Sequence, residues 1–204
     1  MNDSGSTSTS EDSRENLVRF FRSTQLVSPE KAGEFALQFI RKDFHKNEFV
    51  LQEGRITNEY LFLETGFMRS FAHDTEGNDI TTNFFGANQV VFEVASFFNR
   101  TASRENIQAL TDCKTWYLTY QELNRLFHDV PEFRDFGRHI LVRGFSGLKN
   151  RMLSMITETA EERYTHLLSS NPEIFVNAPL KNIATYLGIT DTSLSRIRKE
   201  FSRK

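Results

Sequence analysis

The last 26 residues, Pro179 to Lys204, constrain the fold of this chain more than any other stretch. Apolar residues at helical spacing follow Pro179, which suits the first turn of a helix because its missing N–H would have no partner there. Gly188 then ends that helix, since glycine adopts a left-handed C-terminal cap without a side-chain penalty, and Thr190 offers a hydroxyl cap to a second helix. The pattern predicts two short helices joined by a glycine turn.

Small and apolar residues in this stretch follow the order of a helix-turn-helix. Ala184 stands where the two helices would cross, Gly188 at the turn, and Leu194 as an apolar plug between them. With Leu194 and Ile197 turned to the core, the far side of the second helix is free to enter a major groove. The predicted DNA-binding residues are Lys181, Thr190, Asp191, Thr192, Ser195, Arg196 and Lys199.

Charge supports the same interpretation. From Lys181 to the end the chain has six basic and two acidic residues, a net charge of +4, so the remainder of this −2 chain carries −6. A cationic module on an anionic body is typical of a protein in which one part contacts nucleic-acid phosphates. The simpler alternative is an amphipathic helical hairpin with a solvated basic face, because motifs of this length also arise by chance. Spacing and charge together favour DNA binding.

The composition predicts a globular protein, since 204 residues with 38% hydrophobic and 13% aromatic content can bury a sizeable core. No apolar run approaches the roughly 18 residues of a membrane span, and residues 1–15 lack both parts of a signal peptide. We therefore expect a cytoplasmic protein with no membrane partner. The single cysteine, Cys113, excludes an internal disulfide and a four-thiolate metal site.

The N-terminal two-thirds of the chain is predicted to be a tail followed by a β-domain. Residues 1–15 hold seven Ser or Thr and four acids, and such a segment is expected to be disordered. Short helical patterns follow, and from Phe44 the hydrophobic period becomes two. Strand-length runs occupy residues 44–51, 60–63, 67–72, 80–85, 89–92, 107–110 and 115–118. With glycine turns and no long helices between them, they predict an antiparallel, jelly-roll-like barrel in a domain of residues 16–130.

Helical periodicity returns at Thr119, which forms a capping box with Glu122. A long helix is predicted over residues 131–156. It carries a heptad seam made of Leu141, Phe145, Leu148, Met152 and Met155. We expect this seam to pair two copies as a homodimer, although it could instead pack on its own barrel. Phe133, Phe136 and Ile140 form a second stripe for the barrel.

The C-terminal part of the chain is predicted to be a DNA-binding domain of residues 157–204. Thr159 and Glu162 form a second capping box, and residues 173–176 have the pattern of a short strand before the terminal motif. The domain is expected to be helical, of the winged-helix or helix-turn-helix type. The whole chain is therefore assigned to the α+β class.

The chain resembles the Crp/Fnr superfamily of dimeric transcription regulators in the order of its elements: strands, a helix with the seam, and a terminal helix-turn-helix. The residues that carry the resemblance are EGRITNEYLFLETGFMRSF at 53–71, with the strand–Gly–strand pattern of the cyclic-nucleotide-binding barrel, and LGITDTSLSRIRK at 187–199. The resemblance implies a homodimeric regulator with double-stranded DNA as its partner and no enzymatic activity. It leaves room for RNA polymerase as a further partner.

The resemblance also indicates a ligand segment, which is degenerate in this chain. In the family a Gly-Glu pair and a later Arg-Ser/Thr pair hold the cyclic nucleotide. Glu93 matches the glutamate, but Phe92 replaces the glycine, and Ser103 stands at the arginine position with Arg104 one place late. A serine cannot neutralise a phosphate, and an arginine displaced by one on an extended segment points to the other face. Cyclic nucleotide is therefore disfavoured as a ligand, and no cofactor is expected.

The second helix of the motif departs from the family as well. Asp191 and Thr192 stand where well-studied relatives carry an arginine followed by a glutamate, whereas Arg196 matches a family arginine. The planar fork of Arg196 suits guanine O6 and N7. The half-site sequence cannot be carried over from the relatives.

Three other functions are compatible with a chain of this kind to different degrees. A metal-dependent enzyme of the cupin type needs clustered histidines, whereas the five histidines here are isolated, so no catalytic or metal-binding residues are assigned. A single axial ligand leaves no spacing pattern, so the sequence leaves haem ligation by His45 or His73 open. The main alternative is a dimeric cyclic-nucleotide or other small-ligand sensor that acts on a protein partner, with a weak or non-functional DNA-binding domain.

Overall fold

The computed structural model describes residues 14–201. Most of the predicted disordered tail lies outside the described residues, and Glu15 already begins the first helix. Helices α1 (Glu15–Arg22) and α2 (Pro29–Gln38) occupy the two short helical patterns that precede the strands. Their apolar side chains Leu17, Phe21 and Phe35 are buried in a cluster that also contains residues of the β-strands and of the long helix described below.

Within residues 14–201, eight short strands form two four-stranded antiparallel sheets. The first sheet has the order β1-β8-β3-β6 and consists of β1 (Ile40–Phe44), β8 (Cys113–Thr119), β3 (Glu59–Thr65) and β6 (Gln89–Val91). The second has the order β2-β7-β4-β5 and consists of β2 (Phe49–Leu51), β7 (Asn106–Ala109), β4 (Met68–His73) and β5 (Asp79–Phe85). Buried residues of both sheets form one apolar cluster between them. The antiparallel, jelly-roll-like fold is confirmed, but the predicted barrel is not closed, and we call it the sandwich.

The predicted strand over residues 44–51 is wrong in its extent. The chain leaves the first sheet at Phe44 and enters the second at Phe49, with a turn between them. Asn47 in this turn has φ = +70°, a left-handed conformation that asparagine adopts more readily than most residues. The apolar alternation continues through the turn, so the hydrophobic period alone does not reveal it.

A short helix, α3 (Val94–Asn99), lies between β6 and β7, in a segment for which the sequence pattern predicts neither helix nor strand. Valine and two phenylalanines in six residues give a weak helical propensity. The helix is fixed instead by its N-cap, because the Glu93 carboxylate accepts hydrogen bonds from the backbone N–H groups of Ala95 and Ser96. The helical propensity of residues 94–99 therefore argues against a helix here, whereas the N-cap and the packing of α3 stabilise one.

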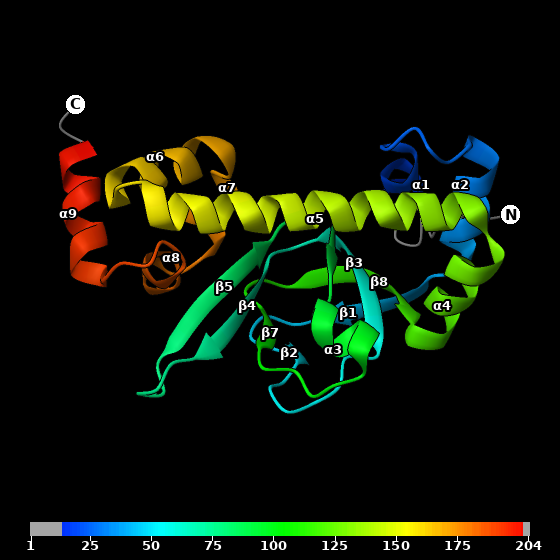
Figure 1. The fold of residues 1–204 in the computed structure, drawn as a ribbon, viewed down its shortest axis with the longest axis horizontal. Helices are drawn as coiled ribbons and strands as arrows, with labels where there is room; N and C mark the ends of the chain where they lie inside the picture. Colours follow the sequence, from blue (N-terminus) through cyan, green and yellow to red (C-terminus); the bar gives the residue numbers. More distant parts are fainter. Residues whose placement is uncertain (1–13, 202–204) are drawn as a thin grey trace, which may run out of the picture.

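Both predicted capping boxes are present. Thr119 with Glu122 caps α4 (Tyr120–Asp129), and Thr159 with Glu162 caps α6 (Ala160–Ser170). Between them, α5 (Pro131–Thr157) runs the length of the molecule, from the N-terminal helices to the C-terminal ones (Figure 1). Phe133 and Phe136 are buried in the main core, as predicted for the second stripe of this helix.

Three further helices complete the described chain: α7 (Glu173–Asn177), α8 (Leu180–Tyr186) and α9 (Asp191–Phe201). The predicted strand over residues 173–176 is wrong, because this segment is α7. Its Ile and Val suggested a strand, but the segment has no strand to pair with and packs Ile174 among helices. From Ala160 to Phe201 the described chain contains helices and no strand, and α8 and α9 have the arrangement of a helix-turn-helix. We call α6 to α9 the helical unit.

No helix in the described part of the chain combines the length and the hydropathy that crossing a membrane requires.

Candidate DNA-binding face and ligand segment

The turn between α8 and α9 has the predicted chemistry. Gly188 has φ = +68°, and its N–H donates to the carbonyl of Thr185 at 3.0 Å. Thr190 Oγ1 then accepts a hydrogen bond from the N–H of Ser193 at 3.2 Å and caps α9. The glycine turn and the threonine cap thus fix the direction in which α9 leaves α8.

Buried apolar side chains hold α8 and α9 against α6 and α7. Ala184, at the crossing of the helices, and Leu194, the plug between them, are 0% and 1% exposed. Other buried members of this cluster are Tyr164, Leu167, Ile174, Ile183, Leu187 and Ile197. Arg163 of α6 adds hydrogen bonds from Nε and Nη2 to the Leu187 carbonyl, at 3.1 and 3.0 Å. The helical unit is therefore one packed body in which the rotation of α9 is fixed.

All seven predicted DNA-binding residues are exposed. Six of them lie on or directly before α9, on the side opposite the buried Leu194 and Ile197. Lys181 is the seventh and lies on α8. The fold thus brings these side chains to one surface, which we call the α9 face. Their contact with DNA stays a prediction.

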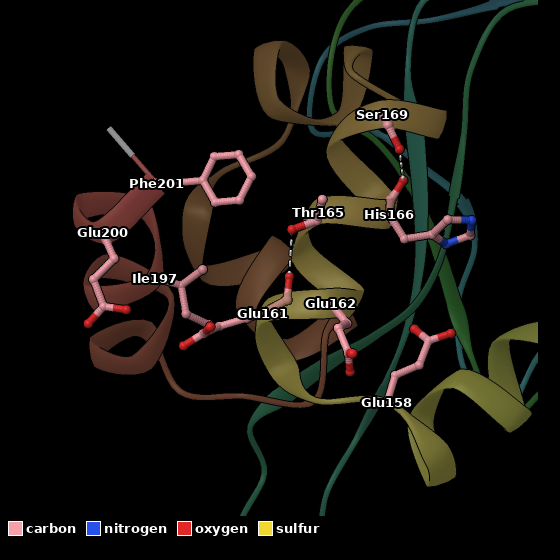
Figure 2. Close-up of a pocket in the computed structure, with 9 residues that line it drawn as sticks. All are labelled: Glu158, Glu161, Glu162, Thr165, His166, Ser169, Ile197, Glu200 and Phe201. Carbon is pink, nitrogen blue, oxygen red and sulfur yellow. Dashed lines mark hydrogen bonds between the residues drawn. The ribbon is translucent and has the colours of Figure 1, made fainter. Parts of the chain in front are cut away.

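The other side of the helical unit is acidic. A groove of about 600 Å³ opens between α6 and α9, and Figure 2 shows side chains of both helices along it. It is lined by Glu158, Glu161, Glu162, Thr165, His166, Ser169, Ile197, Glu200 and Phe201. Hydrogen bonds from the backbone and side chain of Thr159 lower the pKa of Glu162, which keeps this carboxylate charged. Phosphates are repelled from such a groove, so the α9 face is the side of the unit that suits DNA.

Helix α8 covers the free edge of β5, as the arrangement in Figure 1 shows. The Thr81 N–H of β5 donates to Thr185 Oγ1 of α8 at 3.1 Å. Next to it, Arg69 of β4 donates from Nη1 to Asn182 Oδ1 of α8 at 3.0 Å. The helical unit is therefore docked on the sandwich through the first helix of the helix-turn-helix.

Arg151 of α5 strengthens this docking by joining three elements. Its Nη1 donates to the Thr82 carbonyl of β5 and its Nη2 to the Tyr186 carbonyl of α8, both at 2.9 Å. The guanidinium carbon also lies 4.1 Å from the centre of the Tyr186 ring. Neither Arg151 nor Arg69 can be recognised from the sequence as a docking residue, because their partners are distant in the chain. One feature of the sequence does indicate that Arg151 has a partner elsewhere: no acidic residue stands three or four positions away on its own helix.

The five residues of the predicted seam are exposed on this chain, with Phe145 at 70% and Leu148 at 59%. An apolar stripe of this kind is unusual on a free helix surface. Met155, at the end of the stripe, also reaches the turn of its own chain, since a Cβ added at Gly188 would lie 2.4 Å from Met155 Cε. The pairing of two copies through this seam is not tested by a single chain and stays a prediction.

The ligand segment, residues 92–104, contains the short helix α3. Its Glu93 carboxylate caps α3, with distances of 3.0 Å to Ala95 N and 2.6 Å to Ser96 N. The Phe92 ring packs 5.1 Å from the ring of Tyr60 and 5.5 Å from that of Phe97. Both residues are thus engaged within the chain.

The other end of this segment contrasts a buried serine with an exposed arginine. Ser103 is 3% exposed, and its hydroxyl donates to the Glu105 carbonyl at 2.8 Å and accepts from the Glu105 N–H at 3.0 Å. Arg104 is exposed. The structure therefore keeps Ser103 inside and Arg104 outside, which is the arrangement that the one-residue displacement predicts.

The isolated histidines show no shared site. His73 Nδ1 lies 2.9 Å from Glu53 Oε2, and His45 is exposed. Among residues 14–201, no three His, Cys, Asp or Glu side chains are grouped to hold a metal ion.

Comparison with known proteins identifies the sandwich and the overall architecture. Residues 41–129 match the family model of the cyclic nucleotide-binding domain. FixK2 from Bradyrhizobium japonicum is 20% identical, with 81% of this chain and 85% of that chain covered and a TM-score of 0.69. The c-di-GMP-responsive global regulator CLP from Xanthomonas campestris is 16% identical, with 84% and 90% covered and a TM-score of 0.67. No curated protein has significant sequence similarity to the chain.

A third solved structure, of a CooA mutant from Carboxydothermus hydrogenoformans, is 17% identical, with 89% of this chain and 84% of that chain covered and a TM-score of 0.67. The chain shares the fold of these three structures, and its residues 41–129 match the cyclic nucleotide-binding domain.

Proposed function

We propose that the protein is a homodimeric transcription regulator of the Crp/Fnr type that binds specific DNA sequences and does not respond to cyclic AMP. The observation that carries this proposal is the α9 face, an exposed surface with Arg196 and Lys199 on a helix whose other side is packed and fixed. A helix presented in this way can enter a major groove and read base edges. A cytoplasmic location and contact with RNA polymerase are further predictions of the same proposal.

DNA binding is tested first by selecting bound sites from genomic fragments and then by measuring affinities for one selected site and for random DNA. Arg196→Ala should weaken binding to the selected site by about 5- to 150-fold, because a bidentate contact to guanine contributes about 1–3 kcal/mol. Lys199→Ala should weaken selected and random DNA alike and lower the salt slope by about one. Lys149→Ala, which removes an exposed lysine of α5, is the matched control. Failure of the wild type to select any site would favour the alternative, a sensor that acts on a protein partner.

Dimerisation is supported by the exposed seam on α5. In the isolated chain Leu148 is open to water, so a charge introduced there has little effect on the fold of one copy. In a dimer the same charge would be unpaired in an apolar interface, which costs about 3–5 kcal/mol. Leu148→Glu should therefore give monomers in analytical ultracentrifugation.

Leu37→Glu is the control for this experiment, because Leu37 is 71% exposed on α2 and lies outside the seam. This variant should stay dimeric. A wild type that sediments as a monomer at tens of micromolar, or a dimer that both substitutions leave intact, contradicts the seam.

The lack of a response to cyclic AMP follows from the chemistry of the ligand segment. A buried phosphate needs a positive partner, and Ser103 at the family's arginine position cannot supply one. The N–H groups at the start of α3 are already bonded to the Glu93 carboxylate, which would also repel a phosphate at the same place. The residues present therefore do not fit a cyclic phosphate.

Calorimetry with cyclic AMP and cyclic GMP tests this part of the proposal. The expected result is no binding in the micromolar range. Micromolar binding that disappears in Arg104→Ala would show that Arg104 reaches the ligand, and this part of the proposal would then be abandoned.

A further inference from the structure

The acidic groove between α6 and α9 is open along one side of the helical unit. Its volume is about 600 Å³, within the range of roughly 300–1,000 Å³ that is typical of sites that hold a bound molecule. On α6 the lining residues run from Glu161 to Ser169, a stretch about 12 Å long at about 1.5 Å per residue. The groove is therefore large enough for a short segment of a polypeptide chain.

Helix α9 supplies the apolar wall of the groove. Ile197 and Phe201 point from α9 toward α6 in Figure 2. Ile197 is buried, whereas Phe201 keeps 39% of its surface exposed, although its ring packs 5.5 Å from the ring of Tyr164. An aromatic ring that is half-buried in the wall of a groove leaves a surface that an apolar side chain of another molecule can cover.

The charge of the groove is negative. Its lining residues include His166 and four glutamates: Glu158, Glu161, Glu162 and Glu200. Among residues 14–201, no ion pair joins any of these four carboxylates to a lysine, an arginine or a histidine. Their charges are therefore not neutralised within the described chain, and the groove attracts a positively charged partner.

Local structure accounts for three of these glutamates but not for the fourth. Glu162 belongs to the capping box of α6, and Glu158 accepts a hydrogen bond from the serine one turn earlier, at 2.5 Å. Glu161 lies in the first turn of α6, where the helix dipole favours an acid. Glu200 lies in the last described turn of α9, where the helix dipole disfavours one. The position of Glu200 thus gives an independent reason to expect a cation from another molecule.

We propose that this groove docks a basic peptide segment of a protein partner, with lysines or arginines beside an apolar side chain. The basic side chains pair with Glu161 and Glu200, and the apolar side chain packs on Phe201. Charge excludes two other occupants. DNA phosphates are repelled by the same carboxylates, and residues 1–13 of this chain contain three acids and no lysine or arginine.

The proposed docking surface is separate from the α9 face, which lies on a different side of the same helix. The protein can therefore hold DNA and the partner segment together. Peptide binding requires no DNA, so its failure would leave the proposed function untouched, and a failure to bind DNA would leave the groove untouched.

Fluorescence anisotropy with labelled hexapeptides tests the groove on the full chain, at about 0.15 M salt so that remote charges are screened. The probe KRKSLF should bind with a Kd below about 1 mM. Glu161→Gln/Glu200→Gln should weaken that binding by about 5-fold, because two exposed ion pairs are lost. The matched control, Glu30→Gln/Glu76→Gln, removes two exposed glutamates outside the helical unit and should leave binding unchanged.

Two further probes and one further variant separate charge from packing. KRKSGG lacks the apolar side chains and EEESLF has the opposite charge, so each should bind at least about 10-fold more weakly than KRKSLF. Phe201→Ala should weaken KRKSLF by about 10-fold and leave KRKSGG unchanged, because only KRKSLF buries a side chain on the ring. If Phe201→Ala does not fold, the two double glutamine variants decide the question alone.

Three results would each overturn the proposal. The first is no binding of KRKSLF at millimolar concentration. The second is an equal affinity for KRKSGG, which would mean that the surface attracts any polycation. The third is a loss in Glu30→Gln/Glu76→Gln equal to that in Glu161→Gln/Glu200→Gln, which would place the binding outside the groove.

Discussion

Replacing Arg151 by alanine should release α8 from the sandwich without unfolding either part. Arg151 is the residue through which α5 holds β5 and α8 together, by its two hydrogen bonds and its position over the Tyr186 ring. The Thr81 amide reports on this contact directly. Because β5 has no further strand on that side, the Thr81 N–H is protected by Thr185 of α8.

The size of the effect can be estimated from these contacts. A hydrogen bond from a charged donor contributes about 1.5–3 kcal/mol, and a guanidinium over a ring about 0.5–2 kcal/mol. Arg151 is only partly buried, so water recovers part of the loss, and we take about 2–4 kcal/mol for the whole side chain. At about 1.4 kcal/mol per factor of ten, the equilibrium for undocking should rise about 30- to 700-fold.

Amide hydrogen exchange followed by NMR measures this equilibrium residue by residue. In Arg151→Ala the Thr81 amide should exchange about 30- to 700-fold faster, whereas Leu187, whose N–H bonds to Ile183 inside the helical unit, should change little. Arg151→Lys should show a smaller increase, because lysine keeps the charge and loses the fork. Lys149→Ala, on the exposed side of the same helix, is the control.

Two results would refute this reasoning. Unchanged exchange at Thr81 in a folded Arg151→Ala protein would mean that the remaining contacts, including Arg69 with Asn182, suffice for docking. Equal acceleration at Thr81 and Leu187 would mean that the substitution destabilises the whole chain instead of separating its parts.

Three further substitutions have defined expectations, each measured by urea denaturation. Gly66→Ala should lower the free energy of unfolding by more than about 2 kcal/mol, since its φ is +104° and the new Cβ would lie 2.6 Å from the Asp112 carbonyl. Gly188→Ala should lower it by about 1 kcal/mol because of its left-handed φ. Burial and then the charge of Glu93 raise the pKa of Glu105, so wild-type stability should fall as pH rises through that pKa, and Glu105→Gln should remove this dependence. A variant whose free energy of unfolding, or for Glu105→Gln its pH dependence, equals that of the wild type contradicts the corresponding prediction.

The elements that the sequence predicts best are those fixed by local chemistry. Thr119 with Glu122 and Thr159 with Glu162 begin helices because each pair satisfies backbone groups within one turn, whatever the rest of the chain does. Gly188 ends α8 for an equally local reason, its positive φ. The helix-turn-helix and the exposure of its predicted DNA-binding residues follow from such signals together with the buried Leu194.

The features that the sequence does not reveal depend on distant partners. Arg69 meets Asn182 across 113 residues of chain, and no pattern near either residue indicates the contact. The segment that forms α7 has strand-like residues, and only the packing of Ile174 among helices decides its conformation. The open sandwich is a further example, because alternation predicts strands but does not say which strands pair at the edges.

Strand β5 connects the ligand segment to the helical unit. The Thr82 hydroxyl lies 2.8 Å from Ser70 Oγ, and Thr82 also hydrogen-bonds the side chain of Glu105, just past the ligand segment. The Thr82 carbonyl meanwhile accepts the hydrogen bond of Arg151, whose other hydrogen bond holds α8. A displacement of Glu105 therefore acts on the same residue that anchors the docking of α8. One possible result is that Arg151→Ala frees the Thr81 amide and yet leaves DNA affinity unchanged. In that case the contacts from Glu105 through Thr82 and Arg151 do not set the position of α9, and any coupling between the ligand segment and α9 passes along α5 instead.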